Sequence, residues 1–92
     1  MQTYLACFDI QDDRHRRQVA TLLGKHGLRV QKSVFEISVR SPEQLQKLHS
    51  VALRWLAEGD DLRFYHLCRD CRQKSHAMDA RPVADFPLVV ML

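Results

Sequence analysis

An acidic side chain stands near the end of the first apolar run of the chain, YLACFDI, and two more acids follow it. In an extended strand, successive side chains point to opposite faces, so Asp9 shares a face with Leu5 and Cys7. A carboxylate that is partly buried among such neighbours needs a cation, a hydrogen-bond donor or a metal ion. Asp9 is therefore our candidate catalytic residue and metal ligand, and Asp12 and Asp13 are secondary candidates.

These carboxylates are compatible with two interpretations. Mg²⁺-dependent hydrolysis of phosphodiester bonds needs oxygen ligands, usually one or two carboxylates together with phosphate and water. A twofold axis that doubled Asp9 would bring two such groups to one cation. In the alternative interpretation, Asp9 pairs with a nearby arginine, while Asp12 and Asp13 only cap the helix that follows.

Positive charge is concentrated in residues 11–32, which contain six Lys/Arg against two acids, although the net charge of the whole chain is only +3. Such a cluster attracts polyanions more strongly than the net charge implies. Cations at the start of a helix oppose its dipole, which favours phosphate binding over a merely solvated helix face. The candidate nucleic-acid-binding residues are Arg14, Arg16, Arg17, Arg29 and Lys32.

A second group of reactive side chains lies in the sequence HLCRDC. Cys68 and Cys71 have CxxC spacing, and His66 and His76 are the nearby residues that could complete a zinc site. The sequence has no second cysteine pair of this kind, which a structural zinc site usually shows. The alternatives are a redox-active dithiol and two ordinary thiols.

The length of 92 residues indicates one small domain, and its 46% hydrophobic and 27% charged residues are typical of a globular protein. A core of this size is marginal, so we expect an oligomer. No run approaches the roughly 18 apolar residues of a membrane span, and three cysteines without framework spacing favour a reducing compartment. We therefore expect a cytoplasmic protein with no membrane segment.

The pattern of apolar residues and caps predicts alternating strands and helices. Strands are expected at residues 2–10, 28–39 with a break near Lys32–Ser33, 61–68 and 88–92, and helices at 13–26 and from Ser41 to Gly59. The first helix should connect two parallel neighbouring strands. The order predicts an α+β, ferredoxin-like βαββαβ fold with both helices on one sheet face and an extra C-terminal strand. The domain should cover residues 1–78, and residues 79–92 should form a tail that packs on its own or a partner's sheet.

The predicted strands are apolar on both faces, although a two-layer fold covers only one face with helices. A second copy of the chain is the simplest cover, so we expect a homodimer with facing sheets. Phe35 shares a face with Ile37 and Val39, which favours a core position over a platform for stacking bases.

Residues 4–37 closely resemble the small CRISPR-associated adaptation protein family, the second in the numbered Cas series. The family has a strand ending in aromatic-Asp-Ile, an acidic pair, an arginine-rich helix, Gly-Leu followed by Gln, and Ser-Val-Phe-Glu. These features stand here at Phe8-Asp9-Ile10, Asp12-Asp13, Arg14/Arg16/Arg17, Gly27-Leu28, Gln31 and Ser33-Val34-Phe35-Glu36. Phe8 stands where the family more often has tyrosine, so it lacks a hydroxyl near Asp9. The resemblance covers nearly the whole chain, and residues 74–87 are its least typical part.

The resemblance implies a homodimer of ferredoxin-like protomers with the last strand joining the partner's sheet. It implies a role in CRISPR adaptation (spacer acquisition), in which the dimer bridges two copies of the integrase and binds the DNA spacer duplex along basic surfaces. It also implies a metal-dependent endonuclease on RNA or DNA, in which Asp9 binds Mg²⁺ across the dimer; Phe8 and Phe35 are secondary candidates near this site. Two alternatives stay open: a purely structural DNA-binding adaptor without catalysis, and a toxin-like ribonuclease outside any CRISPR system.

Overall fold

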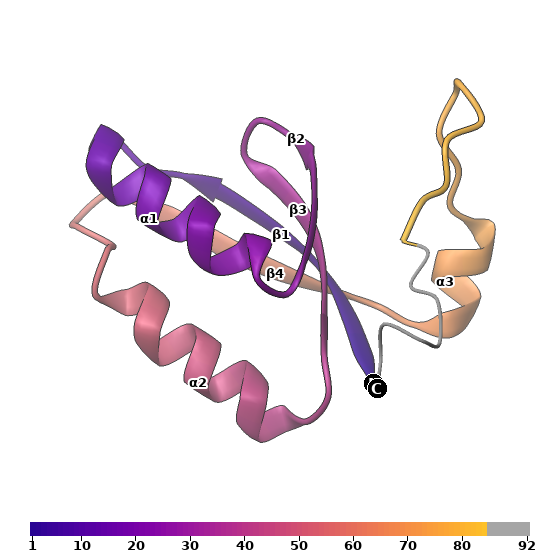
Figure 1. The fold of residues 1–92 in the computed structure, drawn as a ribbon, viewed down its shortest axis with the longest axis horizontal. Helices are drawn as coiled ribbons and strands as arrows, with labels where there is room; N and C mark the ends of the chain where they lie inside the picture. Colours follow the sequence, from indigo (N-terminus) through magenta and orange to yellow (C-terminus); the bar gives the residue numbers. More distant parts are fainter. Residues whose placement is uncertain (85–92) are drawn as a thin grey trace.

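The computed structural model describes residues 1–84, which form four strands and three helices (Figure 1). The elements are β1 (Gln2–Asp9), α1 (Asp13–Gly24), β2 (Gly27–Gln31), β3 (Val34–Val39), α2 (Pro42–Leu53), β4 (Asp61–Leu67) and α3 (Arg69–Lys74). The four strands form one antiparallel sheet in the order β2-β3-β1-β4. The predicted α+β, ferredoxin-like fold is confirmed by this element order and sheet.

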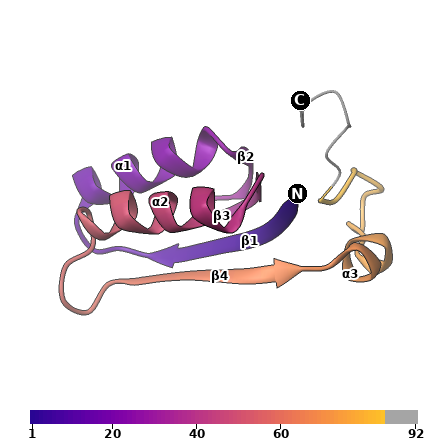
Figure 2. The same ribbon diagram turned by 90° about the horizontal axis from the view of Figure 1, so that it is seen from below.

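Helices α1 and α2 lie on one face of the sheet, and within residues 1–84 its other face carries no helix (Figure 2). Successive side chains of a strand point to opposite faces, so alternate side chains in and just after β1 enter the core between the layers. These are Ala6, Phe8 and Ile10, which are at most 6% exposed. The core is completed by Phe35, Ile37 and Val39 of β3 and by Val19, Leu23 and Leu48 of the two helices. The core position predicted for Phe35 is confirmed.

Strand β1 pairs with β3 and β4, and not with β2. Strands β1 and β2 run parallel, but β3 lies between them. The prediction that α1 connects parallel neighbours was therefore wrong, because the β2–β3 hairpin folds back and inserts β3 beside β1. The predicted break near Lys32–Ser33 is confirmed as the turn of this hairpin.

The two helices begin at capping residues, as predicted. The Asp12 carboxylate accepts a hydrogen bond from the His15 N–H at 2.9 Å at the start of α1. The Ser41 hydroxyl accepts one from the Gln44 N–H at 3.2 Å at the start of α2. Each bond satisfies a backbone donor that the first helical turn leaves free.

Both helices end earlier than predicted, at Gly24 and Leu53. Gly27 does not end α1 but opens β2, where a Cβ atom would lie 1.9 Å from the carbonyl oxygen of Glu36. Gly59 lies in the turn before β4 with a φ of 87°, a conformation that favours glycine. Within residues 1–84, no helix is long and apolar enough to cross a membrane.

Helix α3 was not predicted, because none of its residues is buried and no apolar stripe marks it. The chain after α3 reaches Ala84, which is 3% exposed and whose N–H donates to Glu36 Oε1 at 2.7 Å. This contact places part of the tail on the sheet face that carries no helix. The predicted strand at 88–92 lies outside the described residues.

Candidate active site and nucleic-acid interface

The helix-free face of the sheet carries the strand side chains that alternate with the core. Leu5 of β1 lies between Glu36 of β3 and Tyr65 of β4, and Leu28 of β2 faces Glu36 from the other side. Leu28 and Tyr65 are 63% and 48% exposed. This face therefore displays apolar surface in the single chain, of the kind that marks an interaction site.

At one end of this face, Asp9 of β1 and Asp61 of β4 are direct cross-strand partners. The Asp61 carboxylate accepts a hydrogen bond from Arg63 Nε at 2.8 Å. Asp9 was expected to be partly buried, but it is exposed. The reason is that Asp9 is the last residue of β1 and projects beyond the covered part of the sheet. Within residues 1–84, its carboxylate makes no hydrogen bond or ion pair, so the interpretation in which an arginine neutralises Asp9 is not supported.

Arg63 connects several side chains of the helix-free face. Its guanidinium lies 3.4 Å from the Tyr65 hydroxyl as well as bonding to Asp61, and these two partners raise the pKa of Arg63. Cys7 is its cross-strand partner on β1, and burial raises the pKa of the Cys7 thiol. Asp61 and Arg63 were missed as site residues, because only the β1–β4 register, and not the sequence DDLRF itself, places them beside Asp9.

The carboxylate pair can be compared with the ligands that a hard divalent cation needs. Asp9 and Asp61 supply carboxylate oxygens, the ligand type that Mg²⁺ prefers. In the described part of the chain, no three or more His, Cys, Asp or Glu side chains form a group that could hold a metal ion. One chain thus offers a pair of carboxylates, which fits the Mg²⁺ sites that water and substrate phosphate complete.

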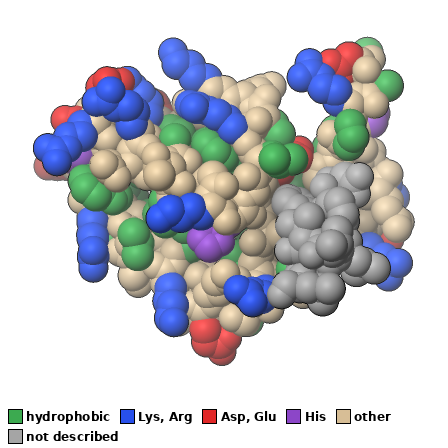
Figure 3. All heavy atoms as spheres, viewed as in Figure 1, with side chains coloured by type: hydrophobic (Ala, Val, Ile, Leu, Met, Phe, Trp, Pro, Cys, Tyr) green, Lys and Arg blue, Asp and Glu red, His purple; other side chains and the backbone are tan. Residues whose placement is uncertain are grey.

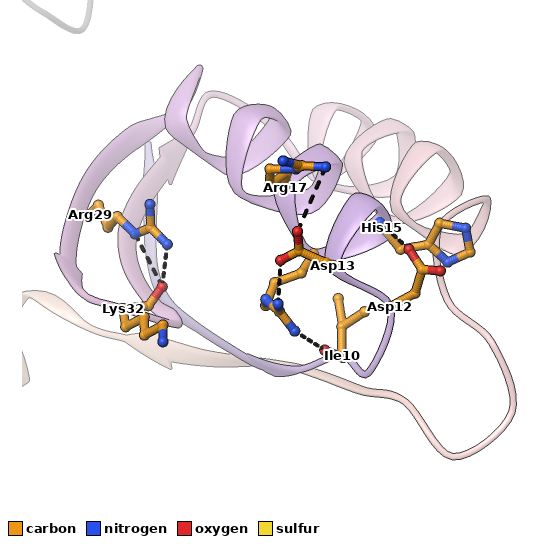
Figure 4. A network of polar contacts seen from close by, with 8 residues as sticks. Ile10, Asp12, Asp13, His15, Arg17, Arg29 and Lys32 are labelled. Atoms are coloured by element: carbon orange, nitrogen blue, oxygen red, sulfur yellow. Dashed lines mark hydrogen bonds and ion pairs between the residues drawn. The ribbon is translucent and has the colours of Figure 1, made fainter.

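The arginines at the start of α1 have different environments (Figure 4). Arg16 donates to the carbonyl oxygen of Ile10 at 2.8 Å and forms an ion pair with Asp13, so it ties the start of α1 to the end of β1. Arg17 lies 3.7 Å from the other carboxylate oxygen of Asp13, and its side chain is 73% exposed. Arg14 is also exposed. Arg14 and Arg17 are therefore accessible to a phosphate, whereas Arg16 already has two partners.

Two acids fix the loop that follows Asp9. The backbone N–H of His15 lowers the pKa of Asp12 by donating to its carboxylate. Asp60 accepts hydrogen bonds from the N–H of Ala57 at 2.8 Å and from the N–H of Gln11 at 3.1 Å, and both bonds lower the pKa of Asp60. These acids act as hydrogen-bond acceptors that hold the end of β1 in place.

The remaining basic candidates lie on the β2–β3 hairpin. Arg29 Nε donates to the carbonyl oxygen of Lys32 at 3.1 Å (Figure 4), and its guanidinium carbon lies 5.6 Å from the centre of the Phe35 ring. Lys32 is exposed. Phe8 and Phe35 stack on each other in the core with ring centres 6.2 Å apart, and they are 6% and 3% exposed. In this position, neither ring is accessible to a nucleic-acid base.

The predicted site residues do not form a single cluster. Lys and Arg side chains project from the face that α1 and α2 cover (Figure 3). Asp9 alternates with the core residues Phe8 and Ile10, so its carboxylate belongs to the opposite, helix-free face. The predicted metal ligand and the basic side chains of α1 therefore lie on opposite sides of the sheet, joined at the short loop between β1 and α1.

Comparison with known proteins identifies close relatives of the chain. The family described as "CRISPR associated protein Cas2" matches residues 1–75. The chain is similar to "CRISPR-associated endoribonuclease Cas2 1" of Chloroflexus aurantiacus, with 43% identity over 74 residues that cover 77% of each chain. It is also similar to "CRISPR-associated endoribonuclease Cas2 4" of Rhodospirillum rubrum, with 37% identity over 71 residues, which are 77% of this chain and 57% of that relative.

The fold is also shared with a solved structure. A chain in the "Partial Cas6-RT-Cas1--Cas2 complex" matches with a TM-score of 0.82 and 37% identity, over 94% of this chain and 100% of that chain. The fold, the sequence identities and the family match over residues 1–75 agree with one another. The chain therefore belongs to the family of the CRISPR-associated protein Cas2.

Proposed function

We propose that this chain acts in CRISPR adaptation as a homodimer that binds nucleic acid beside the integrase Cas1, and that it hydrolyses phosphodiester bonds. The two curated relatives are named CRISPR-associated endoribonucleases. The similar solved chain comes from a complex named for Cas1 and Cas2. The family match favours this role over that of a toxin-like ribonuclease outside CRISPR systems.

The nuclease part of the proposal rests above all on the Asp9–Asp61 pair. Two carboxylates that face each other across neighbouring strands repel, and within residues 1–84 only Asp61 of this pair has a cationic partner. An exposed carboxylate at a strand end that has no partner in the described part of the chain is available to a cation or to a protonated group of the substrate. Asp9 is therefore the residue we assign to catalysis and metal binding, with Asp61 as its neighbour.

The homodimer is proposed from the helix-free face. Leu28 and Tyr65 expose apolar surface there, and Leu5 lies between their strands. A second copy packed face to face would bury this surface and place two copies of each carboxylate pair in the same interface. The described tail contacts this face at Glu36, through the N–H of Ala84.

Mg²⁺ is the cation we assign to this site, because the donors are carboxylate oxygens. When bound, Mg²⁺ would neutralise phosphate charge and lower the pKa of an attacking water. The chain's own part is to position the carboxylates. Arg63 orients Asp61 through its 2.8 Å hydrogen bond, and Asp60 holds the backbone of Gln11, two residues after Asp9.

Nucleic acid is assigned to the basic residues that remain accessible. Arg14 and Arg17 project from α1, and Lys32 projects from the β2–β3 hairpin, where Arg29 bonds to its carbonyl oxygen. Such contacts neutralise phosphates without reading bases, so binding should weaken as salt concentration rises. Arg16 is assigned a positioning role, because its guanidinium is already bonded to Ile10 and Asp13.

The decisive experiment is cleavage of labelled single-stranded RNA and duplex DNA by the native protein and by Asp9→Asn, with Mg²⁺ or with EDTA. We expect Mg²⁺-dependent cleavage that falls at least about 100-fold in the variant, because the amide loses the charge that binds the cation. Asp61→Asn should require more Mg²⁺ for the same rate. Light scattering of each variant would verify that the dimer is intact.

Asp70→Asn is the matched control, since it removes an exposed carboxylate from α3, outside the sheet. It should cleave at the native rate. The assignment of Asp9 would be refuted if the native protein did not cleave either substrate. It would also be refuted if cleavage persisted in Asp9→Asn and in EDTA.

A second function, a DNA-binding adaptor without catalysis, is favoured by one observation. Residues 1–84 of one chain hold no third metal-ligating side chain beside the carboxylate pair. Under this alternative, Asp9→Asn binds duplex DNA and assembles with the integrase as the native protein does, while neither protein cleaves. Replacing Arg14 and Arg17 with glutamate should weaken nucleic-acid binding under both functions, so it tests the surface separately from the chemistry.

A further inference from the structure

Two thiols are in contact at the start of α3, where Cys68 is the N-cap residue and Cys71 lies in the first turn. The sulfur atoms of Cys68 and Cys71 lie 3.2 Å apart. A disulfide bond is about 2.05 Å long, so the sulfurs need to approach by only about 1 Å. Both residues are exposed to solvent. The geometry therefore permits a bond between them and access by a small reagent.

The two thiols are not equivalent. The Cys71 N–H donates to Cys68 Sγ at 3.4 Å, and the Cys71 thiol lies within hydrogen-bond reach of the same sulfur. The backbone bond and then the thiol bond lower the pKa of Cys68, while the contact with Cys68 raises the pKa of Cys71. Since the thiolate is the nucleophile, these contacts favour Cys68 over Cys71 as the thiol that attacks first.

A structural zinc site, the other interpretation of the CxxC spacing, has weaker support. Such a site needs four ligands, nearly always from cysteine and histidine. Over residues 1–84, the structure brings no third His, Cys, Asp or Glu to the pair to form a metal-binding group. His66 and His76, the two residues that could complete such a site according to the sequence, do not join the pair in this part of the chain.

We propose that Cys68 and Cys71 form a redox-active pair that exchanges with small disulfides such as oxidised glutathione. The Cys68 thiolate attacks one sulfur of the disulfide, whose S–S bond breaks and releases one glutathione thiolate. The Cys71 thiolate then attacks the Cys68 sulfur of the mixed disulfide and releases the second glutathione. Two protein thiols are oxidised to one disulfide, one small disulfide is reduced to two thiols, and the two protons pass through water to the leaving thiolates. This chemistry is independent of the proposed nuclease.

The test is incubation of the native full-length protein with oxidised glutathione near neutral pH, followed by thiol titration and mass spectrometry. The thiol count should fall from three to one, with no glutathione retained, and a thiol reductant should restore it. Cys71→Ser should retain one glutathione on Cys68, because the resolving thiol is missing. Cys68→Ser should react more slowly than Cys71→Ser. Cys7→Ser is the matched control and should lose two thiols as the native protein does.

Three results would overturn the proposal. The native protein could keep all three thiols. The disulfide found by peptide mapping could join two protomers or include Cys7. Zinc could copurify with the native protein and be lost in both Cys68→Ser and Cys71→Ser, which would make the pair a metal site instead.

Discussion

Gly27→Ala tests why the β2–β3 hairpin begins where it does. A Cβ atom at this position would lie 1.9 Å from the carbonyl oxygen of Glu36 and 2.7 Å from the Cα atom of Ile37. Both are backbone atoms of β3, so no side-chain rotation can relieve the contact. Gly27 and Ile37 are cross-strand partners, and β2 would have to move away from β3 by at least 1.1 Å to restore a distance of 3.0 Å.

The expected loss of stability follows from that displacement. A shift of this size takes the adjacent backbone hydrogen bonds beyond about 3.2 Å, and each contributes about 0.5–1.5 kcal/mol. Overpacking adds about 1–3 kcal/mol. The free energy of unfolding should therefore fall by about 2–5 kcal/mol, a large part of the roughly 5–15 kcal/mol of a typical domain.

Urea unfolding at a fixed protein concentration, followed by circular dichroism, measures this loss. Gly24→Ala is the matched control, because a Cβ there meets nothing closer than Phe35 Cε2 at 3.9 Å at the end of α1. It should leave stability unchanged or raise it by up to about 1 kcal/mol. The reasoning would be refuted if Gly27→Ala cost less than about 1 kcal/mol, or as little as Gly24→Ala.

Two further predictions concern pH and the tail. Burial, and to a lesser degree the charge of Lys25, lowers the pKa of His26 from 6.5. At pH values between the folded-state pKa and 6.5, the unfolded chain therefore binds more protons than the folded chain. The contribution of His26 to the free energy of unfolding is fully present above pH 6.5 and is lost as the pH drops through that window. In urea unfolding at several pH values, His26→Gln should lack this fall, whereas exposed His76→Gln should keep it. Glu36→Ala should raise the rate of hydrogen exchange at the Ala84 amide by about tenfold or more, because it removes a buried acceptor 2.7 Å away. The control Glu36→Gln should raise this rate less. An unchanged rate in Glu36→Ala would show that this bond does not hold the tail.

Local patterns predicted the parts of the fold that depend on neighbouring residues. Alternation in β1 separated Ala6 and Phe8 from Asp9, and this is the division between core and helix-free face. Ser41 marked the start of α2 because a hydroxyl three residues before a free backbone N–H caps the helix locally. Helix α3 was not predicted, because its sequence RDCRQK has no apolar periodicity.

The parts that the sequence could not give depend on contacts between distant segments. Asp61 lies opposite Asp9 only through the β1–β4 register, which joins strands 52 residues apart in sequence. Gly27 resembled a helix-terminating glycine, although its real constraint is the Glu36 carbonyl across the hairpin. Arg16 had the pattern of a phosphate contact, but it bonds to the carbonyl oxygen of Ile10, just after β1, and to Asp13.

The charge of the helix-free face gives a physical reason for a cation in the proposed dimer. Each protomer brings two carboxylates, Asp9 and Asp61, and one guanidinium, Arg63, to the end of that face, a net charge of −1. Two facing protomers together hold −2, which is costly to leave uncompensated between two sheets. One divalent cation neutralises this charge fully, whereas protonation of a single carboxylate neutralises half of it. An adaptor without a cation must instead keep its two Asp9 side chains apart, so their separation across the dimer interface distinguishes the two functions better than the affinity for nucleic acid does.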